Sequence, residues 1–330
     1  MIDESVRGVP APPLRPLIAW YSGYRQAGLS PGRHRGLPSP YLTVIFTLDD
    51  PLVLARHPDP RQPPGSYRTL VGGLHTSPAL VTHQGRQSGI QLQLSPLGAR
   101  ALFGMPAGEL ASLDVEGGAV LGALADQIVE RIREEPDWPG RFAVLDRVLS
   151  ARLGGSGAAV RAGAGAGAAG AGRAGAADSV SAEVGQAWRR LMAVGGLHNV
   201  SALAAETGWS DRHLRNRFRE ETGLTPKAAA RVIRFDRARR RLQAQATSGE
   251  RPALARLAAD CGYYDQAHLA RDFRELAGCP PSAWLADEFA ELAPGRGVEG
   301  ASSPLGPGQA EFRNVQAAPD GRCQADWHER

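Results

Sequence analysis

Residues 201–226 read SALAAETGWSDRHLRNRFREETGLTP, and residues 254–281 repeat the pattern as LARLAADCGYYDQAHLARDFRELAGCPP. In each copy, apolar residues at helical spacing flank a glycine, which can take the positive φ of a tight turn between helices. The numbering offset is 54 at the first three matched pairs and 55 at the last three. The matched pairs are Leu203 and Leu257, Gly208 and Gly262, Trp209 and Tyr263, Phe218 and Phe273, Gly223 and Gly278, and Pro226 and Pro281. The sequence therefore predicts two helix-turn-helix motifs, the second with one extra residue where its second helix begins.

The second helix of each motif has an outward face that suits double-stranded DNA. In the first motif, with Leu214 and Phe218 buried, this face carries Arg212, Arg215, Asn216 and Arg219. In the second motif the outward positions are Gln266, Ala267, His268 and Arg271. Polar side chains of these types hydrogen-bond base edges and phosphates in the major groove. Arg215 and Arg271 are the expected guanine readers, and Arg219 is an expected phosphate contact. Ser210 or Asp211, and Asp265 in the second motif, are placed to cap these helices.

A basic segment without internal glycine or proline joins the two motifs. In residues 225–242, Pro226 stands where a first helical turn would begin and no glycine or further proline follows, which predicts one continuous helix. At about 1.5 Å per residue the helix spans on the order of 27 Å, close to the roughly 34 Å between successive major-groove faces once the flanking turns are added. Its arginines either form a solvated face or contact phosphate, and Arg239 and Arg240 are the expected phosphate contacts.

The paired motifs, the joining stretch RFDRARRRL (234–242) and the closing stretch FRELAGCPPSAW (273–284) resemble the DNA-binding domain of AraC-type transcription regulators. The resemblance covers roughly residues 184–289. It implies that bases are read by Arg212, Arg215 and Asn216, and by Ala267, His268 and Arg271. Ala267 cannot hydrogen-bond a base, so we expect the second motif to read fewer positions. Tyr264 stands where smaller or charged residues are common in that family.

Length and charge agree with a two-part regulator. The chain has 330 residues and a net charge of +4, and residues 185–290 hold 17 Lys and Arg against 12 Asp and Glu, so the positive excess lies in the DNA-binding region. Three isolated cysteines predict reduced thiols rather than disulfides or a zinc finger. Because no basic-then-apolar leader and no run of 18 apolar residues occurs, we expect a cytoplasmic, nucleoid-associated protein that does not contact membranes.

Four regions follow along the chain: a sensor or dimerisation domain at 10–152, a linker at 153–180, the DNA-binding domain at 181–290 and a disordered tail at 291–330. The linker is expected to be flexible because it is nearly all glycine and alanine. In the N-terminal domain, alternation over 42–48 and 52–55 predicts a hairpin. Further strands are expected at 70–71, 79–82 and 90–94, a loop at 21–40, and helices at 119–134 and 138–152. Strands followed by helices predict an α+β domain, joined to an all-α domain with two helix-turn-helix motifs.

Nothing in the N-terminal sequence identifies a ligand. The expected loop is rich in Gly, Pro, Arg and aromatic residues, so Tyr24, Arg33 and His34 are candidate ligand-binding residues, with a packed or solvated turn as the alternative. The two expected helices could form a homodimer or face their own core. A metal site is a weaker hypothesis, because no carboxylate accompanies the four histidines of this domain at ligand spacing: His34, His57, His75 and His83. We expect no metal and no cofactor.

No hydrolase, phosphate-loop or zinc-protease motif occurs in the chain, and a DNA-repair methyl acceptor would need clustered cysteines that residues 1–260 lack, so we expect no enzymatic activity. The expected function is that of a sequence-specific transcription regulator with a small-molecule effector, and RNA polymerase is a further expected partner. The alternative is a ligand-responsive protein that acts mainly through protein contacts and binds DNA weakly and without specificity.

Overall fold

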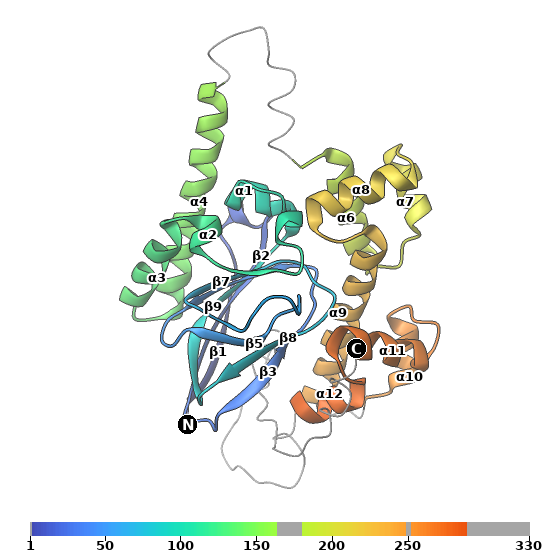
Figure 1. The fold of residues 1–330 in the computed structure, drawn as a ribbon, viewed down its shortest axis with the longest axis horizontal. Helices are drawn as coiled ribbons and strands as arrows, with labels where there is room; N and C mark the ends of the chain where they lie inside the picture. Colours follow the sequence, from blue (N-terminus) through green and yellow to red (C-terminus); the bar gives the residue numbers. More distant parts are fainter. Residues whose placement is uncertain (1, 164–179, 249–251, 289–330) are drawn as a thin grey trace.

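The structure is a computed structural model that describes residues 2–163, 180–248 and 252–288 (Figure 1). Its N-terminal part contains two antiparallel sheets, which are followed by helices. The larger sheet has the order β1 (Ile2–Gly8), β2 (Ile18–Ala27), β9 (Arg86–Leu94), β4 (Leu42–Thr47), β7 (Thr69–Gly72) and β10 (Asp114–Glu116). The smaller sheet has the order β3 (Gly32–Gly36), β8 (Ala79–His83), β5 (Leu52–Arg56) and β6 (Gly65–Tyr67). This arrangement confirms the predicted α+β class.

Alternation along β9 places its side chains in two different layers. Ile90, Leu92 and Leu94 are buried in the main core, which also contains residues of the neighbouring helices. Gln91 and Gln93 point to the opposite face, toward the second sheet, because successive side chains of a strand alternate. A smaller apolar cluster lies between the sheets and joins Tyr24, Ile45 and Leu70 from one sheet to Leu52, Leu54, Ala79 and Val81 from the other.

Two predictions for this domain are wrong. The predicted hairpin does not form, because β4 pairs with β7 and β9 whereas β5 pairs with β6 and β8 in the other sheet. Alternation identifies strands but does not choose their partners. The expected loop at 21–40 is largely strand, in β2 and β3. Its Gly23 marks close packing rather than a turn, since a Cβ there would lie 2.4 Å from the Trp138 ring.

The helices of this domain also differ from the prediction. The helix expected at 119–134 is two helices, α2 (Gly118–Leu121) and α3 (Leu124–Glu134), because Gly122 between them has a φ of 62°. The sequence predicts a linker from residue 153, whereas α4 (Trp138–Gly163) continues to Gly163. A helix that is already nucleated extends through an alanine-containing stretch more easily than a new one forms. The rest of the predicted linker (164–179) and the predicted tail (291–330) lie outside the described residues.

Seven helices follow in the described part of the C-terminal region. They are α6 (Ala182–Ala193), α7 (Val200–Thr207), α8 (Asp211–Thr222), α9 (Pro226–Thr247), α10 (Leu254–Asp260), α11 (Gln266–Ala277) and α12 (Pro281–Glu288). Both helix-turn-helix motifs, α7–α8 and α10–α11, are confirmed, and so is the continuous joining helix, α9. Phe273 meets Phe235 of α9 edge-on, with ring centroids 4.9 Å apart. None of the described helices combines the length and hydropathy that a transmembrane segment requires.

The turn glycines provide a matched pair of tests. Gly208 and Gly262 have φ values of 71° and 74°, so alanine at either position should cost about 1–2 kcal/mol of folding free energy. A Cβ at Gly208 would meet no atom within 4 Å, whereas one at Gly262 would lie 2.1 Å from Leu197. We therefore expect Gly262→Ala to lower the urea midpoint further than Gly208→Ala. In a Leu197→Ala background the difference should disappear, and its persistence would show that Leu197 is not the cause.

Candidate nucleic-acid interface

Helix α8 presents a row of exposed polar side chains. Ser210 accepts a hydrogen bond from the His213 amide and is the cap of this helix, so of the two predicted capping residues the structure selects Ser210. Leu214 and Phe218 are fully buried and fix which face turns outward. All four predicted contact residues of this helix are exposed: Arg212, Arg215, Asn216 and Arg219. Among the described residues, none of their side chains has a salt-bridge partner, so their donors are available to a ligand.

Helix α11 repeats this arrangement with fewer hydrogen-bonding groups. Asp265 caps it, as predicted, by accepting from the His268 amide at 2.7 Å. Ala267 and Arg271 are exposed, and His268 is half-buried with its ring edge-on to Tyr263 at 5.1 Å. The cap and the aromatic contact together restrict the position of this histidine. Of the three residues predicted to read bases here, Arg271 therefore presents the largest set of free donors.

His213 is a further candidate DNA-contact residue, which the sequence analysis does not identify. Its ring stands edge-on to Trp209, with centroids 4.5 Å apart, as the ring of His268 stands to Tyr263. The two histidines are 55 residues apart, the same offset as the matched pairs of the second helices. That offset is the sequence signal that could identify His213, because it places equivalent imidazoles in the first turn of α8 and of α11, the recognition helices of the two motifs.

The spacing of the two motifs is fixed by more than the joining helix. Figure 1 shows α9 running between the first motif and the second. Arg231 of α9 donates to Asp272 of α11 at 2.8 Å and also binds Glu275. The loop before α7 reaches the turn of the second motif, where Leu197 packs against Gly262. The second motif is thus held to α9 by ion pairs and to the loop before the first motif by the contact of Leu197 with Gly262.

Two of the residues predicted to contact phosphate, Arg239 and Arg240, face the N-terminal domain instead. Arg239 is only 9% exposed and donates to Asp236 at 2.8 Å, and Arg240 donates to the same carboxylate at 2.8 Å. The Arg240 guanidinium also lies 4.7 Å from the ring centroid of Trp20 on β2. In this arrangement both side chains face the N-terminal domain, and neither is available to a phosphate. The sequence could not reveal this, because it does not show which face of α9 the other domain covers.

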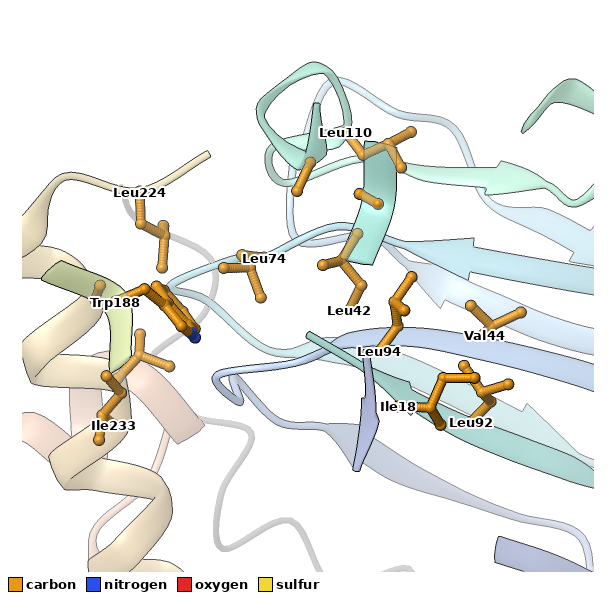
Figure 2. Packing of buried hydrophobic residues seen from close by; sticks show 14 of the residues in the cluster. Ile18, Leu42, Val44, Leu74, Leu92, Leu94, Leu110, Trp188, Leu224 and Ile233 are labelled. Atoms are coloured by element: carbon orange, nitrogen blue, oxygen red, sulfur yellow. The ribbon is translucent and has the colours of Figure 1, made fainter. Parts of the chain in front are cut away.

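The N-terminal domain contacts the helical domain at several separate points. Arg100 of α1 (Ala99–Phe103) binds Glu221 at the end of α8, and Arg35 of β3 donates to Asp287 of α12 at 3.0 Å. Figure 2 shows Leu74 of the N-terminal domain beside Trp188 and Leu224 of the helical domain, and all three belong to one continuous core. The contact is close enough that a Cβ at Gly108 would lie 2.0 Å from the Glu220 carbonyl oxygen.

A cavity of about 150 Å³ lies between the two sheets and extends to helices α9 and α12. Among its walls are two of the predicted ligand residues, Tyr24 and His34, whereas Arg33 is exposed and is not among the lining residues. From the helical domain the cavity is lined by Arg239, Arg240 and Trp284. Gln93 also lines it, and its Oε1 atom is buried with no hydrogen-bond partner among the described residues, so it can accept a bond from a ligand.

The histidines of the N-terminal domain serve different local contacts. His57 bonds Asp114 through Nδ1 at 2.8 Å and Tyr67 through Nε2 at 3.2 Å. His75 bonds the Ser77 carbonyl oxygen, and burial lowers its pKa. Within residues 2–163, 180–248 and 252–288, no group of three His, Cys, Asp or Glu side chains is placed to hold a metal ion.

Two family models match different parts of the chain. A family model described as a helix-turn-helix domain matches residues 203–287, and a domain of unknown function, DUF6597, matches residues 7–116. No curated protein matches the chain.

Among solved structures, a probable AraC family transcriptional regulator from Rhodopseudomonas palustris is 29% identical and covers 32% of this chain and 95% of its own, with a TM-score of 0.28. ToxT from Vibrio cholerae is 12% identical and covers 80% of this chain and 96% of its own, with a TM-score of 0.44. The double helix-turn-helix of residues 203–287 is thus similar to the DNA-binding domains of AraC-type transcription regulators.

Proposed function

We propose that the protein is a sequence-specific transcription regulator that acts in the cytoplasm and places α8 and α11 in successive major-groove segments of one DNA duplex. The observation that carries the proposal is a set of exposed guanidinium groups on the outward faces of the two helices that have no salt-bridge partner in the described part of the chain: Arg212, Arg215 and Arg219 on α8 and Arg271 on α11. Arginine in such positions binds guanine edges and phosphates. The contact between Leu197 and Gly262 supports a fixed spacing of the two helices.

Selection of binding sites from random duplex, followed by titration, tests this proposal. A specific regulator should bind the selected site at least about 10³-fold more tightly than random duplex at physiological salt. Its affinity should fall steeply with salt because phosphate contacts release counterions. Equal affinity for selected and random duplex would contradict the proposal and favour a domain that acts through protein contacts.

Individual arginines should separate base reading from phosphate binding. Arg271→Ala should cost about 1–3 kcal/mol of binding free energy and relax preference at one base position, with the other positions unchanged. Arg217→Ala is a matched control, since it removes one positive charge from a side chain that lies on the flank of α8 and pairs with Glu220 at 2.9 Å. Repeating the site selection with each variant is the measurement. A uniform loss over all sequences would assign Arg271 to phosphate.

We further propose that the N-terminal domain adjusts DNA binding through a small-molecule effector in the cavity between the sheets. The residues that line the cavity support this proposal. Arg239, Arg240 and Trp284 are among them, and they belong to α9 and α12, the helices that hold the second motif. A bound molecule that moved Arg240 would disturb its contact with Trp20.

A thermal-shift screen of the full chain would find effector candidates. By linkage, an effector that changes DNA affinity by some factor must have its own affinity changed by DNA by the same factor. Calorimetric titration of the effector with and without the selected duplex measures this. A ligand that raises the melting temperature without reciprocal coupling would contradict regulation through this cavity.

A further inference from the structure

The extra residue of the second motif is Tyr264. The turn aromatics Trp209 and Tyr263 are 54 residues apart, whereas the capping residues Ser210 and Asp265 are 55 apart, so the insertion falls between Tyr263 and Asp265. The first motif has no counterpart to this residue. Whatever Tyr264 contributes is therefore specific to the second recognition helix.

The two adjacent tyrosines of this turn have opposite environments. Tyr263 is 4% exposed, and the Arg234 guanidinium lies 4.9 Å from its ring centroid. Tyr264 is 94% exposed, more than any other large apolar side chain in the described part of the chain. Its backbone amide donates to Nδ1 of His268 at 3.4 Å, which ties the residue to the first turn of α11. The phenol therefore projects into solvent from an anchored backbone at the entrance of the recognition helix.

We propose that Tyr264 binds the DNA backbone beside the groove entered by α11, with its hydroxyl donating a hydrogen bond to a phosphate oxygen. This inference rests on the proposed function. Tyr264 precedes the capping residue, so it lies outside the helix. When a helix enters the major groove, the DNA beyond its end is the phosphate backbone that borders the groove rather than base edges. The phenol is a neutral donor of the kind that makes such contacts.

The surroundings of Tyr264 argue for a nucleic acid rather than a protein partner. Its exposed neighbours Asp265 and Gln266 are polar. Among the described residues, the other exposed large apolar side chains are Ile2, Val9 and Val53, which lie in the N-terminal domain, and the half-exposed Leu197, which lies beside Gly262 of this turn. Tyr264 and Leu197 alone make a smaller apolar patch than those that mark a protein interface. A backbone contact would also offset the weak hydrogen-bonding capacity of this motif, because Ala267 on the reading face has no donor or acceptor in its side chain.

Tyr264→Phe tests the contact because it removes only the hydroxyl. On the selected duplex and on random duplex alike, we expect about three- to tenfold weaker binding, the size of one hydrogen bond. Base preference should stay the same, and so should the slope of affinity against salt, because a neutral donor releases no counterion. The melting temperature of the free protein should not change, since the side chain is exposed. Val53→Ala, at an exposed apolar residue of β5, is the control and should bind as the wild type does.

Ethylation interference locates the contacted phosphate. The wild type should be sensitive to ethylation at one phosphate flanking the second half of the site, and Tyr264→Phe should lose that sensitivity alone. Wild-type affinity of Tyr264→Phe, or an altered base preference, would overturn the inference while leaving the proposed function intact. If the wild type itself failed to distinguish selected from random duplex, the proposed function would fail, whereas a three- to tenfold loss on random duplex would still support the phosphate contact.

Discussion

Replacing Asp236 by alanine should lower the free energy of unfolding by about 3–5 kcal/mol, the usual cost of leaving a buried charge without its partner. Asp236 is buried in α9 and accepts hydrogen bonds from both Arg239 and Arg240. Without the carboxylate, the Arg239 guanidinium would stay buried beside the interdomain cavity and lose the counter-charge that Asp236 supplies. Urea unfolding of the full chain measures the loss. Asp50→Ala is a suitable control, because Asp50 pairs with Arg86 at the surface, where such a pair is worth about 0–1 kcal/mol.

The effect of Asp236 should also depend on pH in a defined direction. Burial alone would raise the pKa of this carboxyl, but the charges and hydrogen bonds of Arg239 and Arg240 outweigh burial and lower the pKa below its usual 3.8. A group whose pKa is lowered by folding contributes stability above its unfolded pKa and loses it as the pH falls through the folded value. The stability difference between wild type and Asp236→Ala should therefore be constant between about pH 5 and 8 and shrink below about pH 4. A difference that grew on acidification would contradict the ion-pair account.

The same substitution should alter the contact between the domains. Asp236 holds Arg240, whose guanidinium stacks on Trp20 of the N-terminal domain. Its loss should therefore increase proteolytic cleavage between the domains before global unfolding. Equal cleavage rates in the two proteins under native conditions would show that Arg240 keeps its place without the carboxylate.

The features that could be predicted from the sequence are local ones. The caps Ser210 and Asp265, the positive φ of Gly208 and the continuity of α9 depend on residues within one or two helical turns, so the sequence pattern was sufficient. The exposed face of α8 followed because the buried positions Leu214 and Phe218 define its opposite side.

The features that could not be predicted depend on distant partners. Nothing in the alternation of residues 42–55 states that β4 and β5 belong to different sheets, because each strand could satisfy the same pattern with other neighbours. The role of Arg239 was missed for a similar reason, since a basic residue on a helix has the same sequence signature whether it faces solvent, DNA or another domain. The sequence predicts a loop for His34 and Tyr24, whereas both lie on strands that line the cavity.

Proline in place of Ala238 should break the joining helix and cost about 3 kcal/mol or more. Ala238 is fully buried near the middle of α9, and proline there would remove the hydrogen bond to the carbonyl of Arg234 and clash with that turn. Ala238→Gly is the matched control, because it keeps the hydrogen bond and should cost only about 1 kcal/mol. The kink would also shift Arg231, which binds Asp272 of the second motif at 2.8 Å.

The footprint on the selected duplex distinguishes loss of spacing from loss of stability. We expect Ala238→Pro, assayed at a temperature where circular dichroism shows it folded, to protect only one half of the site, because two motifs that no longer hold a fixed separation cannot both enter their groove segments. Ala238→Gly should protect both halves. A full-length footprint at wild-type affinity with Ala238→Pro would mean that the contact of Leu197 with Gly262, rather than the straight helix, sets the distance between the recognition helices.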